Sequence, residues 1–518
     1  MKRPHAVLAG LVALAGMLTL ETRADDRIIS PATGHQPAHS YSISDIETID
    51  NASGNLYLHI PITQLPPGPG GFTAGLTLTY SNRYWETEPL PISTPVGNTT
   101  LYPLTRSSSG GWHLAMTPVL EHIYIGSLGV GDPCGNYSDL FQLVLTNPDG
   151  SRNHFLLSSP AQSMPAACEA GTYRRSLVEN VSSVWYTADG SFLRLKMEAA
   201  SGTGWPNNAS WTVYRQDGTS MHYDVATHLT YLRDHNGNKI TISKTAGSTP
   251  YEVMTDDFGR SIRLDHYADR DEVSQTGHNG QTLVWKVYYG EAGAMTPTQY
   301  RFEYTYNWPA LFTAPPPAAT SLELPNGLSY TFGYTPTEST SSNYRELRTI
   351  TLPTGAVVEY GYRLDTSPDP TDYYHILANT VKSKKVSIDG TVVESWSYDF
   401  PVNSSTGAWS SSTITAPDGG VTSHVFNTIA YKYATAPDAG IITKTVHPDG
   451  SITQRELAYN APYEKPASLL YPNPWVKRVL TSTANAAGTR VATSIRVFTA
   501  DKNGNTTSVE ERGWVAYS

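Results

Sequence analysis

Pro353-Thr354-Gly355-Ala356-Val357-Val358-Glu359-Tyr360 joins a tight turn to a run in which polar and apolar residues alternate. Proline fits the first corner of a type I turn, and glycine adopts the left-handed conformation from which the chain returns as a paired strand. The same pattern of Pro, then Asp, Asn or Thr, then Gly recurs at Pro148-Asp149-Gly150, Pro325-Asn326-Gly327, Pro417-Asp418-Gly419 and Pro448-Asp449-Gly450. This recurrence predicts an array of antiparallel β-hairpins.

Other glycines add a repeat period. Gly218, Gly237, Gly259 and Gly280 are separated by 19, 22 and 21 residues, with strand-like runs between them. A period near twenty, with two strands and one turn in each unit, is typical of hairpins stacked into a continuous sheet. The glycines predicted to form structural turns are Gly150, Gly218, Gly237, Gly259, Gly327, Gly355, Gly419 and Gly450.

The composition favours an all-β protein and argues against some classes of partner. The chain of 518 residues contains 41 Gly, 36 Pro and 33 Tyr, and only 16% of its residues are charged. A net charge of -10 and a pI near 5.8 disfavour binding to nucleic acid or to an anionic membrane surface. The one short basic run, residues 382–385, is predicted to be a solvated strand edge.

The N-terminus has the features of an export signal. Lys2 and Arg3 precede an apolar stretch at residues 6–20, and Thr22-Arg23-Ala24 offers small residues at the two positions that signal peptidase recognises. We predict that residues 1–24 are removed. Because no later stretch approaches the ~20 apolar residues of a membrane helix, the mature chain is expected in the periplasm, at the cell surface or secreted.

The pattern along the chain divides it into five segments. These are a signal peptide at 1–24, an irregular leader at 25–45, an N-terminal β domain at 46–208, β-hairpin repeats at 209–400 and a C-terminal β-hairpin region at 401–518. The expected fold is all-β, with antiparallel hairpin repeats that form a continuous spiral sheet, open or closed, after the N-terminal β domain.

Several repeat segments share a local pattern in which an Asp is followed three positions later by Gly and then by Asn or Arg. This pattern occurs at residues 234–238 and 256–260, and His222-Tyr223-Asp224 follows Gly218. Together with Ser53-Gly54-Asn55-Leu56 and residues 324–334, these pieces resemble the rearrangement-hotspot (Rhs) or tyrosine-aspartate (YD) repeat family. The resemblance covers scattered pieces between residues 45 and 370.

Membership of that family would imply a spiral of β-hairpins that winds into a hollow shell, with a C-terminal core cassette and a variable effector. This chain shows no C-terminal core motif and no effector segment, so the resemblance is to the N-terminal portion of such a protein. The implied partners are a downstream Rhs core or effector polypeptide, a cell-surface protein or a glycan. The implied setting is a polymorphic-toxin or surface system of bacteria.

No common catalytic signature occurs in the chain, and neither a nucleophile elbow, a zinc-protease motif nor a P-loop is present. Residues 269–272 place three carboxylates in four positions, which suits a glycosidase pair or a calcium site, but a solvated loop is the favoured interpretation. Residues 234–238 and 501–505 resemble calcium loops, yet their glycine falls at the fourth position, so hairpin turns explain them better. We predict no catalytic residue, no metal site and no cofactor.

An alternative class of function rests on aromatic residues. Tyr300, Phe302, Tyr304 and Tyr306 alternate on one strand face that ends at Trp308. Such a stripe is typical of a sheet core and also of a sugar-stacking platform. Two hypotheses therefore stand: a non-enzymatic exported scaffold, shell segment or contact surface at the cell envelope, and a secreted carbohydrate-binding or carbohydrate-active β protein that uses Tyr304 and Trp308.

We predict that Cys134 and Cys168 form a disulfide in the mature protein. They are the only two cysteines, they follow an export signal, and the hairpin expected between them would bring its flanks together. Non-reducing peptide mapping of exported material should recover the two cysteine peptides as one linked species. Two thiols that alkylate in the folded protein would contradict the bridge.

Overall fold

The computed structural model describes most of the chain from residue 41 onward. The described stretches are 41–43, 46–82, 85–87, 90–94, 97–101, 104–106, 111–124, 140–149, 151–157, 173–174, 182–198, 209–224, 228–246, 250–290, 318–335, 346–363, 380–401, 403, 408–429, 438–460, 473–484, 489–501 and 503–516. Within them the chain forms β-strands and two short 3-10 turns, η1 (Pro69–Gly71) and η3 (His278–Gly280). The expected all-β fold is confirmed.

One antiparallel sheet of 24 strands dominates the structure, and its strands pair almost entirely in chain order. Its strands are β13 (Leu156–Leu157), β15 (Ser183–Tyr186), β16 (Arg194–Met197), β17 (Trp211–Tyr214), β18 (Ser220–Asp224), β19 (His228–Arg233), β20 (Lys239–Thr245), β21 (Tyr251–Asp256), β22 (Ser261–His266), β23 (Arg270–Thr276), β24 (Thr282–Gly290), β25 (Ala318–Glu323), β26 (Ser329–Tyr334), β27 (Leu347–Thr351), β28 (Val357–Arg363), β29 (Thr380–Ile388), β30 (Thr391–Asp399), β31 (Trp409–Thr415), β32 (Val421–Ile429), β33 (Ile442–Val446), β34 (Ile452–Asn460), β35 (Asn473–Ala484), β36 (Arg490–Ala500) and β37 (Thr506–Ala516).

Smaller sheets come from the first part of the chain. The N-terminal sheet contains β1 (Tyr41–Ile43), β2 (Glu47–Asp50), β3 (Leu56–Gln64), β4 (Gly75–Ser81) and β9 (Gly111–Leu114). A second sheet contains β10 (Val119–Tyr124), β11 (Leu140–Thr146), β12 (Arg152–His154) and β14 (Tyr173–Arg174). Two separate hairpins are β5 (Trp85–Thr87) with β8 (Leu104–Arg106) and β6 (Leu90–Thr94) with β7 (Gly97–Leu101).

The long sheet is continuous across the segment boundaries expected from the sequence. β16 pairs with β17 on either side of residue 208, with Met197 opposite Trp211. β30 pairs with β31 on either side of residue 400, with Ser397 opposite Thr415. The sheet is open, because the two strands at its ends, β13 and β37, do not pair with each other.

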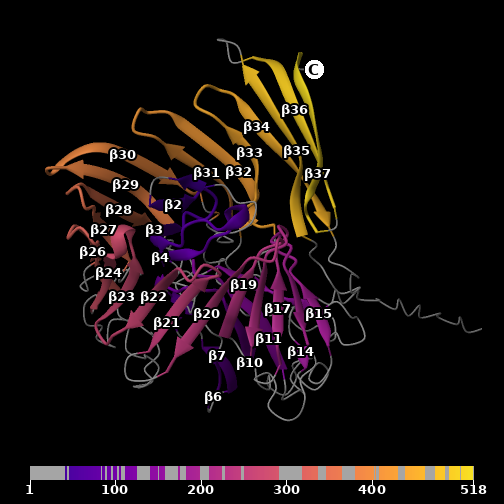
Figure 1. The fold of residues 1–518 in the computed structure, drawn as a ribbon. Helices are drawn as coiled ribbons and strands as arrows, with labels where there is room; N and C mark the ends of the chain where they lie inside the picture. Colours follow the sequence, from indigo (N-terminus) through magenta and orange to yellow (C-terminus); the bar gives the residue numbers. More distant parts are fainter. Residues whose placement is uncertain are drawn as a thin grey trace, which may run out of the picture.

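The long sheet curves around the N-terminal sheet. In Figure 1 the long sheet is a curved strip of strands, called the strip below, that passes from β15 through β24 and β30 to β37. The strands β2, β3 and β4 lie on its concave side. One hydrophobic core joins residues of the N-terminal sheet, such as Leu58 and Leu78, to residues of the long sheet from Ile240 to Ile442. A second core joins β10 and β11 to the first strands of the strip through Leu143, Trp185 and Trp211.

The hairpin turns share one hydrogen-bond arrangement. The Gly355 N–H donates to the Leu352 carbonyl at 2.8 Å, and the Leu352 N–H donates to the Ala356 carbonyl at 2.8 Å. This is a three-residue loop with a type I turn and a glycine bulge, which requires a left-handed final residue. Gly355 has a φ of 88°. The other described turn glycines have φ values between 76° and 93°, namely Gly218, Gly237, Gly259, Gly327, Gly419 and Gly450; Gly150 lies outside the described residues.

Aspartate side chains stabilise these turns in two ways. Asp234 Oδ1 accepts the backbone N–H groups of Asn236 at 2.9 Å and Asn238 at 2.8 Å. In the Pro-Asp-Gly form, Asp418 Oδ1 accepts the Gly420 N–H at 2.8 Å. Because an Asx-type bond satisfies amides that the ladder leaves unpaired, the recurring Asp has a structural cause. Hairpin turns begin at Asp234 and Asp501, as expected, since the Gly237 N–H donates to the Asp234 carbonyl and the Gly504 N–H to the Asp501 carbonyl.

Replacing Gly355 by valine should destabilise the protein by about 1 to 3 kcal/mol, because a β-branched residue is strained at positive φ. A Cβ at this position would meet no heavy atom within 4 Å, so the loss would come from backbone strain and not from a clash. Urea unfolding should show a smaller loss for Gly355→Asn, since asparagine tolerates the left-handed region. Equal midpoints for wild type and Gly355→Val would contradict the turn.

Candidate functional site

The candidate functional site is the interface between the N-terminal sheet and the concave face of the long sheet. β2 is wholly buried, and most residues of β3 and β4 are buried as well, with Leu56, Leu58 and Leu78 at 0% exposure. Polar residues are buried with them, including Glu47, Asp50 and Asn55. Buried polar groups need partners. The long sheet supplies partners of Glu47, whereas Asp50 accepts the Ala52 and Ser53 N–H groups of its own turn.

A buried ion pair lies at the centre of this interface. The carboxylate of Glu47 on β2 contacts the ammonium group of Lys384 on β29, and it also accepts a hydrogen bond from the hydroxyl of Tyr360 on β28. The Lys384 ammonium lies 4.3 Å from the centre of the Trp396 ring, a cation–π contact. Glu47 and Lys384 have side-chain exposures of 5% and 8%, so both charges depend on these contacts.

A second polar group lies beside this pair. Tyr80 on β4 accepts the Leu347 N–H at 3.1 Å and donates to Glu346 Oε2 at 3.5 Å. Tyr362 donates to the Leu347 carbonyl at 2.6 Å. Burial raises the pKa of Tyr362 well above its ordinary value, and nearby Tyr80, Glu346 and Glu47 raise it further. Tyr362 is therefore a neutral hydrogen-bond donor at neutral pH.

Backbone contacts hold the turn between β2 and β3 in the same interface. The Gly54 carbonyl accepts the Val381 N–H at 2.9 Å, and the Ala52 carbonyl accepts the indole N–H of Trp409 at 2.7 Å. A Cβ added at Gly54 would lie 2.7 Å from the Thr380 Cβ. The Gly54 backbone thus lies too close to the Thr380 and Phe400 side chains for any side chain at this position.

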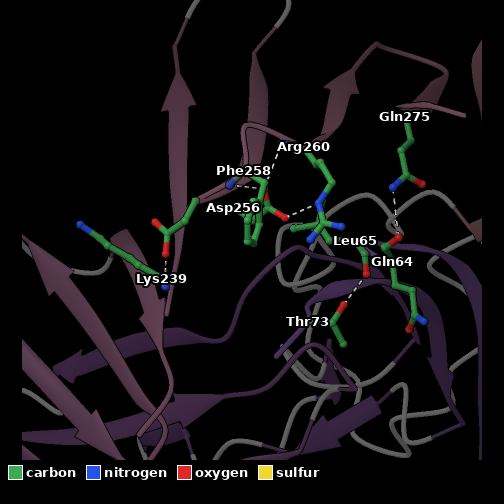
Figure 2. A network of polar contacts seen from close by, with 9 residues as sticks. Gln64, Leu65, Thr73, Lys239, Asp256, Phe258, Arg260 and Gln275 are labelled. Carbon is green, nitrogen blue, oxygen red and sulfur yellow. Dashed lines mark hydrogen bonds and ion pairs between the residues drawn. The ribbon is translucent and has the colours of Figure 1, made fainter. Parts of the chain in front are cut away.

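The opposite end of β3 and the loop after it contact the turn ends of two hairpins of the long sheet, β19–β20 and β23–β24, and Figure 2 shows the second of these contacts. Gln275 donates to the Gln64 carbonyl at 3.1 Å, and Asn238 donates to the Pro69 carbonyl at 3.0 Å. Arg260 donates from Nε to Asp256 Oδ2 at 2.7 Å. Burial alone would raise the pKa of Asp256, but hydrogen bonds from Arg260 and the Phe258 N–H lower it.

The last hairpins of the strip meet the tip of one of the first. Asn473, at the start of β35, accepts the Gly190 N–H at 2.9 Å and donates to the Thr187 carbonyl at 3.0 Å. A Cβ added at Gly504, in the turn between β36 and β37, would lie 2.6 Å from the ring of Phe192. The strip therefore curves so far that its last hairpins contact the turn between β15 and β16 near its start.

The carboxylate cluster at 269–272 is engaged in contacts within the sheet. Asp271 Oδ2 accepts a hydrogen bond from the Tyr289 hydroxyl at 2.8 Å, and Asp271 Oδ1 lies 2.7 Å from His266 Nδ1. Arg270 pairs with Asp269 at 3.0 Å and with Glu272 at 2.7 Å. The hydrogen bond to Asp271 raises the pKa of His266. The expectation of a solvated loop was wrong for residues 270–272, since they lie on β23. There Asp271 contacts His266 and Tyr289 of the neighbouring strands, while Glu272 pairs with Arg270 of the same strand.

The basic run at 382–385 also differs from its prediction. β29 is an internal strand that pairs with β28 and β30, and Lys384 is buried while Lys382 and Lys385 are exposed. A solvated strand edge was therefore wrong for Lys384. The clue in the sequence was the alternation, since Lys384 has the parity of the apolar Val386 and the opposite parity to Lys385. Lys382 shares that parity but lies at a register irregularity between β28 and β29, and it is exposed.

Several predicted sites lie outside the described residues. These are the signal peptide, the two cysteines Cys134 and Cys168, and the aromatic stripe with Tyr304 and Trp308. Among the residues that are described, no three His, Cys, Asp or Glu side chains are placed to share a metal ion. In the same residues, no helix has the length and apolar character needed to cross a membrane.

Comparison with known proteins does not assign the chain to a family. No family model matches it, and no curated protein matches it either.

Removing the Lys384 charge should destabilise the protein by about 3 to 5 kcal/mol, because Glu47 would be left buried without its partner. Urea unfolding of Lys384→Met should show this loss. The double variant Glu47→Gln with Lys384→Met should recover much of it, since neither charge then remains buried. Lys385→Met, on the exposed side of the same strand, is the matched control and should change stability by less than about 0.5 kcal/mol. Equal effects at 384 and 385 would contradict the buried pair.

Proposed function

We propose that the protein is an exported, non-enzymatic scaffold of the Rhs or YD-repeat kind that encloses a folded segment of polypeptide within a spiral strip of hairpins. The single observation that supports this most is the N-terminal sheet on the concave side of the strip, held there by the Glu47–Lys384 pair. The contact of Asn473 with the tip at Thr187 adds to the support, because it joins the strip to itself around that sheet.

The resemblance to the Rhs or YD-repeat family now has a physical counterpart in the turns. The Asp and Gly positions that carry the resemblance, such as Asp234 and Gly237, are the residues whose hydrogen bonds and left-handed backbone make the hairpin. A strip of this kind needs no catalytic group, since its proposed role is to enclose another segment of polypeptide. In the proposed setting it acts at the cell envelope as a shell segment or contact surface, with a core or effector polypeptide, a surface protein or a glycan as partner.

Enclosure predicts protection of the N-terminal sheet from proteases. The segment 46–82 contains Tyr57 and Tyr80 as chymotrypsin sites, and each is 1% exposed. Phe258 is 64% exposed. Under native conditions chymotrypsin should leave the bonds after Tyr57 and Tyr80 intact until the whole protein unfolds, while cleavage at or near Phe258 proceeds first. Peptide mass spectrometry over a time course measures both, with protein in urea as the control in which all these sites are cut.

Two outcomes would contradict the proposal. Cleavage at Tyr57 or Tyr80 as fast as at Phe258 would mean that the strip does not enclose the N-terminal sheet. Recovery of the full chain in the cytoplasm, with no change on deletion of residues 2–24, would exclude an envelope role. Glycan-array binding that is lost in Tyr304→Ala and Trp308→Ala would instead favour the carbohydrate-binding alternative.

A further inference from the structure

A row of polar side chains, called the polar row below, crosses five strands of the strip from β31 to β35. Its members lie directly opposite one another in successive strand pairs, and they are Ser412, His424, Thr445, Thr453 and Thr481. Directly opposite residues of an antiparallel pair share one face of the sheet. The side chains meet accordingly, with His424 Nδ1 lying 3.1 Å from Thr445 Oγ1.

The polar row lies on the face of the strip that meets the N-terminal sheet. Ser412, at one end of the row, donates a hydrogen bond from its hydroxyl to the Asn51 carbonyl in the turn between β2 and β3. The hydrophobic core that the two sheets share extends along the strip as far as Ile442 on β33. On β34 and β35 the row therefore places hydroxyl groups on the concave face beyond that core.

Arg455 lies beside the polar row. It follows Thr453 by two positions on β34, in a stretch of regular register with β35, so its side chain lies on the same face of the sheet. Its Nη1 atom is shielded from solvent and has no hydrogen-bond partner among the residues that the structure describes. Burial lowers the pKa of Arg455, and no carboxylate in the described part of the chain opposes that shift.

Two arginines of the neighbouring strands are balanced by carboxylates. Arg478 on β35 pairs with Glu456, and Arg496 on β36 pairs with Glu511 at 2.8 Å. Both of these arginines are exposed. A buried charge without a partner costs far more free energy than an exposed one. Arg455 has the more costly surroundings and lacks the carboxylate, which indicates that its charge serves to bind a ligand.

Two imidazole groups lie close to Arg455. His447 Nε2 lies 3.0 Å from Thr453 Oγ1, beside the polar row. The pKa of His424 is lowered to about 4, first by burial and then by the charges of Arg455 and His447, while Asp50 opposes the shift. The Arg455 charge therefore acts on the row without being cancelled by Asp50, and His424 is a neutral hydrogen-bonding group at neutral pH.

We propose that Arg455 and the polar row form a binding site for an oxyanion, a phosphate or carboxylate group, on the concave face of the strip beyond the N-terminal sheet. A guanidinium group binds either of these groups through two parallel hydrogen bonds. The hydroxyl groups of Thr453 and Thr481 supply neutral donors on the same face. A bound anion gives Arg455 the opposite charge that it lacks. The inference does not depend on the proposed scaffold function.

Calorimetric titration with inorganic phosphate at constant ionic strength tests the site. The wild type should bind phosphate, and Arg455→Met should weaken binding at least tenfold. Arg455→Lys should keep part of the affinity, because lysine retains the charge and loses the planar pair of donors. Arg478→Met removes an exposed, paired arginine of the next strand and is the matched control, with binding unchanged. Acetate titrated in the same way distinguishes the two oxyanions, since a carboxylate site binds acetate through Arg455 and a phosphate site does not.

The melting temperature gives an independent readout. Without an anion, Arg455→Met should raise it by about 1 to 2 °C, because a buried charge without a partner is removed. Phosphate should then raise the melting temperature of the wild type more than that of Arg455→Met, since a ligand stabilises the state that binds it. Equal phosphate binding by these two proteins, binding of neither anion by the wild type, or a lower melting temperature for Arg455→Met without an anion would each overturn the proposal.

Discussion

The concave face of the long sheet is apolar, and an apolar face must be covered. Apolar burial contributes roughly 25 cal/mol for each Å² removed from water, and a curved strip cannot cover its own inner face. The N-terminal sheet meets this constraint, since Leu58 and Leu78 share one core with Ile262, Val358 and other residues of the strip. The curvature of the strip and the position of the N-terminal sheet therefore both depend on the hydrophobic core that the two share.

Hydrophobic contact alone would allow the N-terminal sheet to settle in more than one position. The Glu47–Lys384 pair and the approach of Gly54 to Thr380 remove that freedom, because a displaced sheet would leave a buried charge unpaired or bring a backbone into collision. A buried ion pair is weak evidence for added stability, since its desolvation is costly. Its clearest effect here is on specificity: it defines which part of the strip the β2 strand faces.

The sequence predicts the local part of this structure well and the distant part poorly. Gly355 and Asp234 predict their turns correctly, because each turn is formed within five residues and the interactions that stabilise it lie in the local sequence. Asn473 and Thr187 form a hydrogen bond although they are 286 positions apart in the sequence. The residues around each of them give no indication of this pairing. Lys384 illustrates the same limit, because its burial depends on a carboxylate far earlier in the chain. The carboxylates at 269–272 were misplaced for a smaller reason: a strand rich in charge resembles a loop when its cross-strand partners are unknown.

The alternation of polar and apolar residues holds only where another layer covers the sheet. β22 and β31 alternate because the core lies against one face. β30 is exposed at its first five residues, and β37 is exposed from Thr506 to Val515. These strands extend past the N-terminal sheet, which is too small to follow the strip to its end. Hydrogen bonds between strands, and not a buried face, hold the outer parts of the sheet in place. Strand length and core coverage are thus independent properties here, and the parts of the strip beyond the core are where its surface is open to other molecules.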